Sequence, residues 1–301
     1  MEELMNNQMD IGNPTRTRAI LEKYGLSAKK SLGQNFLTDP NVLLNIVDAA
    51  EVSPEDDVIE VGPGIGSLTE QIAKRAHHVL AFEIDRNLMN VLDETLSPYD
   101  NITVVNQDVL KANVNEEVEN HLDGKRRLKL VANLPYYITT PILKTFMAST
   151  LPIDKMVVMM QKEVAERLTA QPGDKEYGSL SVVVQYRMNT QIEFDVSSKV
   201  FVPRPKVDSA IVSLTPRAGW EVMPEDDKDF FKTVHGCFMH RRKNIWNNMQ
   251  GLYGKEPEIK AKIQNVLDDL GIDPQVRPER LTVLDFIKLH NRIQIEGLKR
   301  K

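Results

Sequence analysis

Short apolar runs alternate with helical patterns through the first half of the chain, and this alternation constrains the fold more than any other feature. The runs lie at 58–61, 79–83, 102–106, 128–132 and 155–160, and helices are expected at 67–76 and 86–96. Strands that alternate with helices predict a parallel sheet with helices on both faces. In such a sheet, ligands bind at the carboxyl ends of the strands. The sequence therefore predicts an α/β fold with a ligand site at one edge of the sheet.

The pattern changes in the second half of the chain. After Gly178, one helix and two strands are expected at 179–187, 191–197 and 209–214. Further on, helical segments are expected near 225–250, 256–269 and 279–294. The stretch Pro216–Pro224 is the expected domain boundary. The sequence thus predicts a larger sheet domain over 1–217 and a smaller helical domain over 218–301.

Composition excludes several classes of protein. The 301 residues, 41% of them hydrophobic, suffice for a full core. No stretch approaches the roughly 20 apolar residues of a membrane helix, and no secretory signal is visible. The lone Cys237 excludes an intrachain disulfide and favours the reducing cytoplasm. Neither His77 with His78 nor His235 with His240 has the ligand spacing of a metal site, so no metal is expected.

The net charge is the one feature that counts against a nucleic-acid partner. It is −5, with a pI of about 5.8, whereas affinity for a phosphate backbone comes from Lys and Arg. Local patches nevertheless decide binding. Basic clusters occur at Lys29-Lys30, Lys125-Arg126-Arg127, Arg241-Arg242-Lys243 and Lys299-Arg300-Lys301. A solvated surface would explain any one of them equally well.

A glycine-rich turn follows the first apolar run. Its sequence, Glu60-Val61-Gly62-Pro63-Gly64-Ile65-Gly66, precedes a predicted helix. Glycines such as Gly62 and Gly64 let the backbone pass close to a ligand. A dinucleotide-binding turn would need a glycine at position 67, where this chain has Ser67. The turn is thus compatible with a nucleoside ligand, and a plain structural turn stays an open alternative.

Acidic residues follow the next two strands. Glu83 lies 21 residues beyond Gly62 (83 − 62), where an acidic group accepts hydrogen bonds from ribose hydroxyls. Asp108 follows the third strand, where it can accept from an adenine amino group or serve as a helix cap or turn residue. Because the turn and both acids converge on one crevice, they predict a nucleoside site. Without a diphosphate-binding signature, S-adenosylmethionine fits better than NAD.

The run Asn133-Leu134-Pro135-Tyr136 ends the fourth strand and is expected at the same edge. An adenine amino nitrogen is a poor nucleophile because its lone pair is delocalised into the ring. The Asn133 side-chain oxygen and the Leu134 backbone carbonyl can accept hydrogen bonds from its two N–H groups, which localises the lone pair and stabilises the developing charge. Tyr136 offers a face on which the base stacks. These residues predict a methyltransferase acting on an amino nitrogen of a base, although a strand-end turn with a packed aromatic would contain the same residue types.

Seven motifs then follow one another along nearly the whole chain. They are Lys29-Lys30-Ser31-Leu32-Gly33-Gln34-Asn35-Phe36-Leu37, the glycine turn, Phe82-Glu83-Ile84-Asp85, Gln107-Asp108, Asn133-Leu134-Pro135-Tyr136-Tyr137, 200–209 and Arg241-Arg242-Lys243-Asn244. In this order the chain resembles the small-subunit ribosomal RNA adenine dimethyltransferases, the KsgA group. The resemblance implies a Rossmann-like methyltransferase sheet, dependent on S-adenosylmethionine, with a smaller helical C-terminal domain.

The resemblance also implies roles for single residues. The residues implied to contact the cofactor are Asn35, Leu37, Gly62, Gly64, Glu83, Asp108 and Asn133. Those implied at the target adenine are Asn133, Leu134, Tyr136 and Phe201, the last closing the opposite side of the base. From sequence alone, Asn35 can equally be a capping residue and Phe201 a core aromatic. Basic residues that can meet phosphates are Arg204, Lys206, Arg241, Arg242 and Lys243; the last three are interpreted as part of a helix face.

The implied reaction transfers two methyl groups to N6 of each of two adjacent adenosines. These lie in a hairpin near the 3′ end of the small-subunit RNA, and the reaction occurs late in 30S assembly. The implied partner is this RNA within a 30S precursor, bound by a monomeric, cytoplasmic enzyme that contacts no membrane. The helical domain 218–301 is expected to help dock the enzyme on the subunit.

Three other functions fit parts of the sequence. A large-subunit adenine methyltransferase of the macrolide-resistance group shares the fold, but usually has Ile where this chain has Leu134. A DNA adenine methyltransferase commonly has Pro at that position. An assembly factor that has lost catalysis would not need the intact Asn133 and Tyr136, although a dual role in catalysis and assembly is compatible with both residues.

Overall fold

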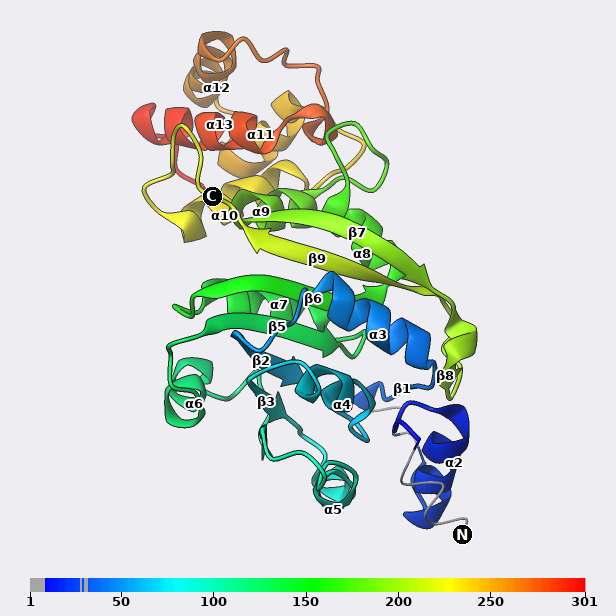
Figure 1. Cartoon of the computed structure of the whole chain (residues 1–301). Coiled ribbons are helices and arrows are strands. Elements are labelled where there is room, and N and C mark those ends of the chain that lie inside the picture. Colours follow the sequence, from blue (N-terminus) through cyan, green and yellow to red (C-terminus); the bar gives the residue numbers. More distant parts are fainter. Residues whose placement is uncertain (1–8, 28, 30–31, 301) are drawn as a thin grey trace. The chain divides into compact units, whose positions relative to one another are not determined.

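A computed structural model describes residues 9–27, 29 and 32–300 of the chain. Of the motif residues above, Lys30, Ser31 and Lys301 lie outside the described residues. The chain forms two compact units, shown in Figure 1. Unit 1 comprises Met1–Ala165 with Gln191–Pro216, and unit 2 comprises Glu166–Thr190 with Arg217–Lys301.

The strands of unit 1 form the sheet that the sequence predicts. Its order is β4-β3-β2-β5-β6-β9-β7, and the first five strands are parallel while β9 runs antiparallel to β6. The strands are β2 (Asp56–Val61), β3 (His78–Phe82), β4 (Ile102–Val105), β5 (Arg127–Asn133), β6 (Ile153–Gln161), β7 (Met188–Val196) and β9 (Ser209–Pro216). The first strand of this sheet in sequence, β2, therefore lies inside the sheet, with β3 on one side and β5 on the other. The strand order reverses at this point, which is where open α/β sheets bind their ligands.

Helices α4 (Ser67–Ala73), α5 (Arg86–Thr95), α6 (Val114–His121) and α7 (Thr139–Ala148) connect the parallel strands, as the alternating pattern predicts. Helices α2 (Pro14–Lys23) and α3 (Pro40–Ala49) precede β2, and α8 (Lys162–Thr169) follows β6. Helix α3 starts at Pro40 because the Asp39 carboxylate accepts hydrogen bonds from the N–H groups of Asn41 and Val42. Helices α3 and α4 pack on the same side of the sheet (Figure 1), where Leu43 and Ile72 are fully buried against the strands.

A small two-stranded sheet lies outside the main one. Strand β1 (Phe36–Leu37) pairs antiparallel with β8 (Phe201–Val202), so that Leu37 lies opposite Phe201. The one-turn helix η2 (Ser198–Val200) precedes β8. This pairing brings a segment from near the start of the chain against one from 165 residues later (201 − 36), which fixes the position of the residues before β1.

Unit 2 is helical and has a core of its own. It contains α9 (Ser179–Arg187), α10 (Asp227–Cys237), α11 (Ile245–Tyr253), α12 (Pro257–Asp269), the short η3 (Pro278–Arg280) and α13 (Val283–Ile295). Tyr177 and Tyr186 are buried in the same cluster as Phe230 and Phe286. Residues 166–190 therefore belong to this unit in addition to the segment that follows the predicted boundary.

The helix expected over 225–250 is two helices. Helix α10 ends at Cys237 and α11 begins at Ile245, where the Asn244 side chain accepts a hydrogen bond from the Asn247 N–H. An Asn side chain caps a helix start well and competes with the backbone inside a helix, which explains the break. Within the described residues, no helix of either unit has the length and apolarity needed to cross a membrane.

A buried ion pair ties β2 to β5 at the end of the sheet opposite the ligand edge. The Lys129 ammonium lies 3.1 Å from the Asp56 carboxylate, and both side chains are almost completely buried. Lys129 also donates to the carbonyl oxygens of Ala50 and Glu51, at 2.9 and 2.6 Å. A charge buried this deeply needs its partner, because the desolvation penalty stays when the partner is removed.

We expect Asp56→Ala to lower the free energy of unfolding by an amount near the lower end of about 3–5 kcal/mol. The loss stays near this lower end because Lys129 keeps its two carbonyl acceptors. Urea denaturation followed by circular dichroism measures the change. The double variant Asp56→Ala/Lys129→Met removes the stranded charge and should recover part of the loss. A double variant no more stable than Asp56→Ala would contradict this account.

Candidate functional site

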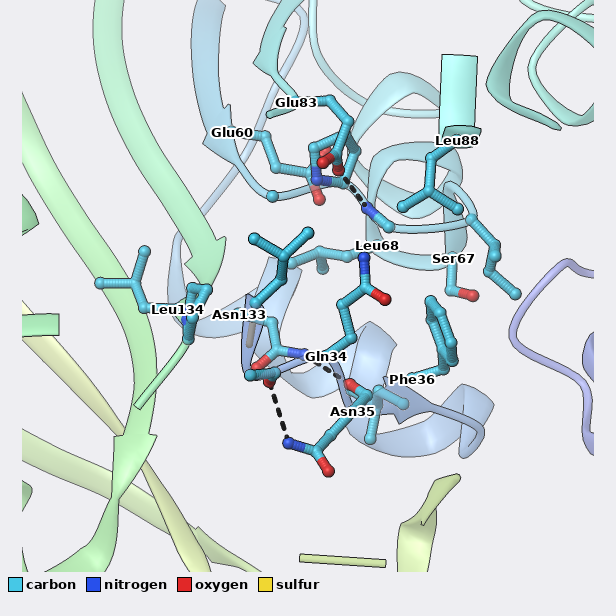
Figure 2. Close-up of a pocket in the computed structure, with 18 of the residues that line it drawn as sticks. Gln34, Asn35, Phe36, Glu60, Ser67, Leu68, Glu83, Leu88, Asn133 and Leu134 are labelled. Atoms are coloured by element: carbon cyan, nitrogen blue, oxygen red, sulfur yellow. Dashed lines mark hydrogen bonds between the residues drawn. The ribbon is translucent and has the colours of Figure 1, made fainter. Parts of the chain in front are cut away.

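A pocket lies at the carboxyl ends of β2, β3 and β5. It is lined by the glycine turn after β2, by Glu83 after β3 and by Asn133 at the end of β5. The segment Leu32–Leu37, which leads into β1, forms another wall. Figure 2 shows these side chains around the pocket. The pocket therefore brings together most of the site residues that the sequence predicts: Asn35, Leu37, Gly62, Gly64, Glu83, Asn133, Leu134 and Tyr136.

The glycine turn has the backbone conformation that its sequence predicts. Gly62, Gly64 and Gly66 all have positive φ angles, of 73°, 63° and 93°. A Cβ atom at Gly66 would lie 2.8 Å from Leu96 Cδ2, so packing as well as conformation requires a glycine there. A Cβ at Gly62 would meet nothing within 4 Å, so that position faces open space. A ligand can consequently approach the backbone of the turn at Gly62.

Glu83 is buried and held by backbone donors. Its carboxylate accepts hydrogen bonds from the N–H of Asp85 at 2.7 Å and of Gly64 at 3.4 Å. Burial raises the pKa of the Glu83 carboxyl to about 6, because the two backbone donors only partly compensate for lost hydration. The second bond, drawn in Figure 2, joins the glycine turn to the end of β3. Glu83 is thereby fixed at the position where the sequence predicts contact with a ribose.

Glu60 is a site residue that the sequence interpretation missed. Its side chain lines the pocket beside Glu83 and is 1% exposed, and its Oε2 atom has no hydrogen-bond partner. Burial, together with the nearby charge of Glu83, raises the pKa of Glu60 to about 8. An acidic residue inside the apolar run Val58–Val61 was the available signal. Two buried carboxyl groups in one pocket favour a ligand that supplies positive charge or hydrogen-bond donors.

The segment before β1 is connected to Asn133. The Asn133 Nδ2 donates to the Asn35 carbonyl at 3.4 Å, and the Asn35 Nδ2 donates to the Gly33 carbonyl at 3.1 Å. These bonds fix the Asn133 amide so that its Oδ1 points away from Asn35. Asn35 directly precedes β1 and is not at a helix cap, and its contact with a ligand stays a prediction.

Gln34 was also missed. Its side chain extends into the pocket (Figure 2), and its Nε2 donates to the Asp85 carboxylate at 3.0 Å. The Lys29 ammonium lies 2.7 Å from the same carboxylate, and the Lys29 N–H donates to the Gln34 Oε1 at 2.9 Å. The Lys29 ammonium therefore pairs with a carboxylate of its own unit.

The Asn133–Tyr136 run forms a rigid turn between β5 and α7. The Leu134 N–H donates to the Met159 carbonyl at 3.3 Å, and the Pro135 carbonyl accepts from the Ile138 N–H at 3.1 Å. The Tyr136 hydroxyl lies 2.6 Å from the Ser209 Oγ of β9. Burial raises the pKa of the Tyr136 hydroxyl, so it stays neutral near pH 7. The ring of Tyr136 is thus anchored at its far end while the residue lines the pocket.

Two predicted site residues do not line this pocket. The Asp108 Oδ1 accepts a hydrogen bond from the Leu110 N–H at 3.1 Å, and the carboxylate lies 3.6 Å from the Lys111 ammonium, so Asp108 acts as a turn residue here. Phe201 is 3% exposed and belongs to the core cluster that contains Leu37. Both placements match the structural alternatives that the sequence left open.

The predicted phosphate-binding residues are exposed. Arg204 and Lys206 line a second hollow, where the Arg204 Nε donates to the Ser198 Oγ at 3.1 Å. Arg241–Lys243 lie in the connection between α10 and α11, so the interpretation as a helix face is wrong; α10 ends at Cys237, and α11 begins only after its N-cap, Asn244. The Arg241 Nη2 also donates to the Lys175 carbonyl at 2.7 Å. In the part of the chain that is described, no group of three or more His, Cys, Asp or Glu side chains is arranged to hold a metal.

Comparison with known proteins identifies the family. Residues 25–294 match the model of the family described as "Ribosomal RNA adenine dimethylase". The chain belongs to this family. It is accordingly a methyltransferase that uses S-adenosylmethionine as methyl donor. The unpartnered carboxyl oxygen of Glu60, next to Glu83, fits a donor that carries positive charge and ribose hydroxyls.

Individual relatives agree with this assignment. The chain is 58% identical to "Ribosomal RNA small subunit methyltransferase A" of Levilactobacillus brevis, over 98% of this chain and 100% of the relative. It is 53% identical to the protein of that name from Staphylococcus aureus, over 95% and 96%. Among solved structures, a dimethyladenosine transferase from Plasmodium falciparum is similar with a TM-score of 0.72 and 26% identity, over 87% of this chain and 98% of that one.

A second solved structure belongs to the large-subunit group. The 23S rRNA methyltransferase ErmE is similar with a TM-score of 0.66 and 29% identity, over 86% of this chain and 100% of that one. This chain therefore shares its Rossmann-like fold with a 23S rRNA methyltransferase. The fold by itself does not tell a small-subunit RNA substrate from a large-subunit one.

We expect Glu60→Gln to flatten the pH dependence of stability. The pKa of Glu60 is about 8 in the folded protein against an ordinary value of 4.5, so the folded state binds the proton more tightly than the unfolded state. Wild-type stability should therefore fall between about pH 4.5 and 8, with a slope of at most about 1.4 kcal/mol per pH unit from this group.

Urea denaturation at several pH values in this window tests the expectation. Relative to the wild type, Glu60→Gln should gain stability as the pH rises. Glu55→Gln, which removes an exposed carboxyl from the same segment, serves as the control and should follow the wild type. Parallel curves for wild type and Glu60→Gln would show that the Glu60 carboxyl does not hold its proton in the folded state.

Proposed function

We propose that this protein dimethylates N6 of two adjacent adenosines in a hairpin near the 3′ end of small-subunit ribosomal RNA. The observation that carries the proposal is the position of Asn133–Tyr136, at the end of β5 and in the same pocket as Glu83 and the glycine turn. Membership of the adenine dimethylase family and 58% identity to a protein named for the small subunit support the choice of base and subunit.

Residues on the glycine-turn side of the pocket hold the cofactor. Glu83 accepts hydrogen bonds from the ribose hydroxyls, and Gly62 and Gly64 admit the ligand close to their backbone. Asn35 and Leu37 cover the methionine end from the segment before β1. Asp108 contacts the adenine amine in this proposal, which requires it to leave its contact with Lys111.

Asn133 and Leu134 activate the target nitrogen. When bound, S-adenosylmethionine would supply a methyl group on a positively charged sulfur; the amino nitrogen would form a bond to this methyl carbon while the sulfur leaves as a neutral thioether. The Asn133 Oδ1 and the Leu134 carbonyl accept hydrogen bonds from the two N–H groups of N6, which favours a localised lone pair on the nitrogen. Both acceptors are fixed before the base arrives, Asn133 by Asn35 and Leu134 by Met159, so little reorganisation is needed in the transition state.

Tyr136 positions the base. Its ring stacks on the target adenine, and its bond to Ser209 keeps the ring in one orientation. No strong base is required, because the methylated nitrogen becomes acidic and loses its proton to water. Phe201 contributes through Leu37, its partner in the pairing of β1 with β8, and supports the pocket wall from the core.

Basic residues next to this site contact the RNA backbone. Ser209, which binds Tyr136, adjoins Asp208 in the lining of the second hollow, where Arg204 and Lys206 lie exposed. The two cations can meet phosphates on either side of a base held by Tyr136. Because the chain carries a net charge of −5, such contacts are few and local.

Unit 2 docks the enzyme on a nearly mature 30S subunit, late in its assembly. Its independent core and the exposed Arg241–Lys243 loop support this role. Monomeric action is part of this proposal. It works where its ribosomal substrate is assembled, in the cytoplasm.

Small subunits from cells that lack this gene test the proposal. Incubated with the protein and radiolabelled S-adenosylmethionine, their RNA should yield N6,N6-dimethyladenosine near the 3′ end. Label confined to large-subunit RNA would move the protein to the group of ErmE. Binding to the subunit without any label would favour a non-catalytic assembly factor.

We expect Asn133→Ala to reduce kcat by about 10²–10³, the usual cost of one fixed acceptor or donor in the transition state. Single-turnover methylation of unmodified small subunits measures the rate, and thermal unfolding checks that the fold is kept. A variant with kcat within threefold of the wild type would remove Asn133 from the catalytic role.

A role as an assembly checkpoint predicts a further difference between the wild type and Asn133→Ala. If methylation triggers release, Asn133→Ala should stay on small subunits longer than the wild type does in the presence of S-adenosylmethionine. Co-sedimentation over time measures this residence. Equal residence would contradict release upon methylation while leaving the methyltransferase activity unaffected.

A further inference from the structure

Tyr137 is the one aromatic residue of this chain that is exposed. The chain has nine Phe, seven Tyr and two Trp residues, and all of them are within the described part. Tyr137 is 57% exposed, whereas every other aromatic side chain is buried or half-buried. Aromatic rings usually bury their large apolar faces. An exposed ring directly beside the candidate active site therefore requires an explanation other than packing.

Its exposure follows from the turn that it shares with Tyr136. The Pro135 carbonyl accepts bonds from the Ile138 N–H and the Thr139 Oγ1, both at 3.1 Å, which closes a tight turn around the two tyrosines. Tyr136 lines the pocket and binds Ser209, while Tyr137 does not line the pocket and is exposed to solvent. The two tyrosines are thus neighbours in the sequence, but Tyr136 lines the pocket and Tyr137 lies outside it.

The Tyr137 ring is supported along one edge. A Cβ atom at Gly33 would lie 3.0 Å from its Cε1 and 3.1 Å from its Cδ1, so the ring lies against the backbone of Gly33, whose φ is +62°. The Gly33 carbonyl accepts from Asn35, and the Asn35 carbonyl accepts from Asn133. Tyr137 is therefore positioned relative to Asn133 through two hydrogen bonds, with the rest of the ring open to solvent.

The chemistry of the target explains what such a ring binds. An adenine that enters the pocket loses its stacking on the neighbouring base, and that neighbour loses a stacking partner in turn. An exposed aromatic ring that contacts a residue of the pocket lining, as Tyr137 contacts Gly33, can replace the lost partner, since any base stacks on an aromatic face. With two adjacent adenosines as targets, the neighbour is always a purine when the first of them is in the pocket.

We propose that Tyr137 stacks on the nucleobase next to the target adenosine and so holds the RNA strand while the target base occupies the pocket. The ligand is an unpaired purine nucleotide adjoining the one bound by Tyr136. This inference rests on the proposed RNA substrate and adds a binding residue to it. Tyr137 acts on the affinity for RNA and not on the methyl transfer itself.

Three substitutions separate stacking from other roles. Tyr137→Phe keeps the ring and removes the hydroxyl; Tyr137→Leu keeps an apolar side chain and removes the planar face; Tyr137→Ala removes both. Steady-state methylation of unmodified small subunits gives kcat and KM for each protein, and calorimetry gives the Kd for S-adenosylmethionine. Thermal unfolding confirms that the exposed position tolerates each change.

The proposal expects Tyr137→Leu and Tyr137→Ala to raise KM for the subunit, on the order of 5- to 100-fold as for the loss of one base–aromatic stack. Their kcat and their Kd for S-adenosylmethionine should stay within about twofold of the wild type. Tyr137→Phe should behave like the wild type in all three quantities, because stacking needs the ring and not the hydroxyl.

Several results would overturn the inference. Unchanged KM in Tyr137→Leu, or an equal loss in Tyr137→Phe, would exclude stacking. Weaker binding of S-adenosylmethionine in Tyr137→Leu would show that the ring acts only by supporting Gly33 and the pocket wall. The wild-type protein tests the proposed function separately. If it methylates the subunit, the proposed function stands whatever the Tyr137 variants show. If it does not, the proposed function fails before the variants are compared.

Discussion

The parallel pairing of β2 with β5 is the constraint on which the rest of the site depends. In this register Ile59 lies opposite Leu130, so both strands end at the same edge of the sheet. Gly62 and Asn133 follow from these two ends, and β3 adds Glu83 from the other side of β2. Donor and target can meet in one pocket because the strand order reverses at this point. The buried ion pair of Asp56 with Lys129 holds the opposite end of the same two strands.

Burial of acidic groups gives this pocket its electrostatic character. Glu60 and Glu83 lie side by side in a region from which most water is excluded, and burial raises the pKa of both. Burial makes each carboxyl harder to ionise than it is in water, Glu60 more than Glu83, and a ligand that brings hydrogen-bond donors or positive charge reverses this effect. The methyl donor of this family carries both. The same low exposure that makes these residues costly for folding therefore makes the pocket selective for its ligand, a common compromise at functional sites.

The RNA-facing side works on a different principle. The residues proposed to meet phosphates are exposed, and the chain as a whole is acidic, so this proposal relies on a few local contacts and not on a general field. The stacking proposed for Tyr136 and Tyr137 suits this situation, because base–aromatic contacts do not depend on net charge. Unit 2 has a hydrophobic core of its own, separate from that of the sheet.

The sequence by itself determined the parallel sheet, the glycine turn and the cluster of Glu83, Asn133 and Tyr136, because strand periodicity and strand ends are local properties. Tertiary structure decided what depends on contacts between distant segments. Phe201 lies in the core because β8 pairs with β1, and Gln34 enters the pocket because the segment before β1 folds over the sheet edge. The insertion of 166–190 into the helical unit and the burial of Glu60 are likewise set by packing, which a linear pattern does not contain.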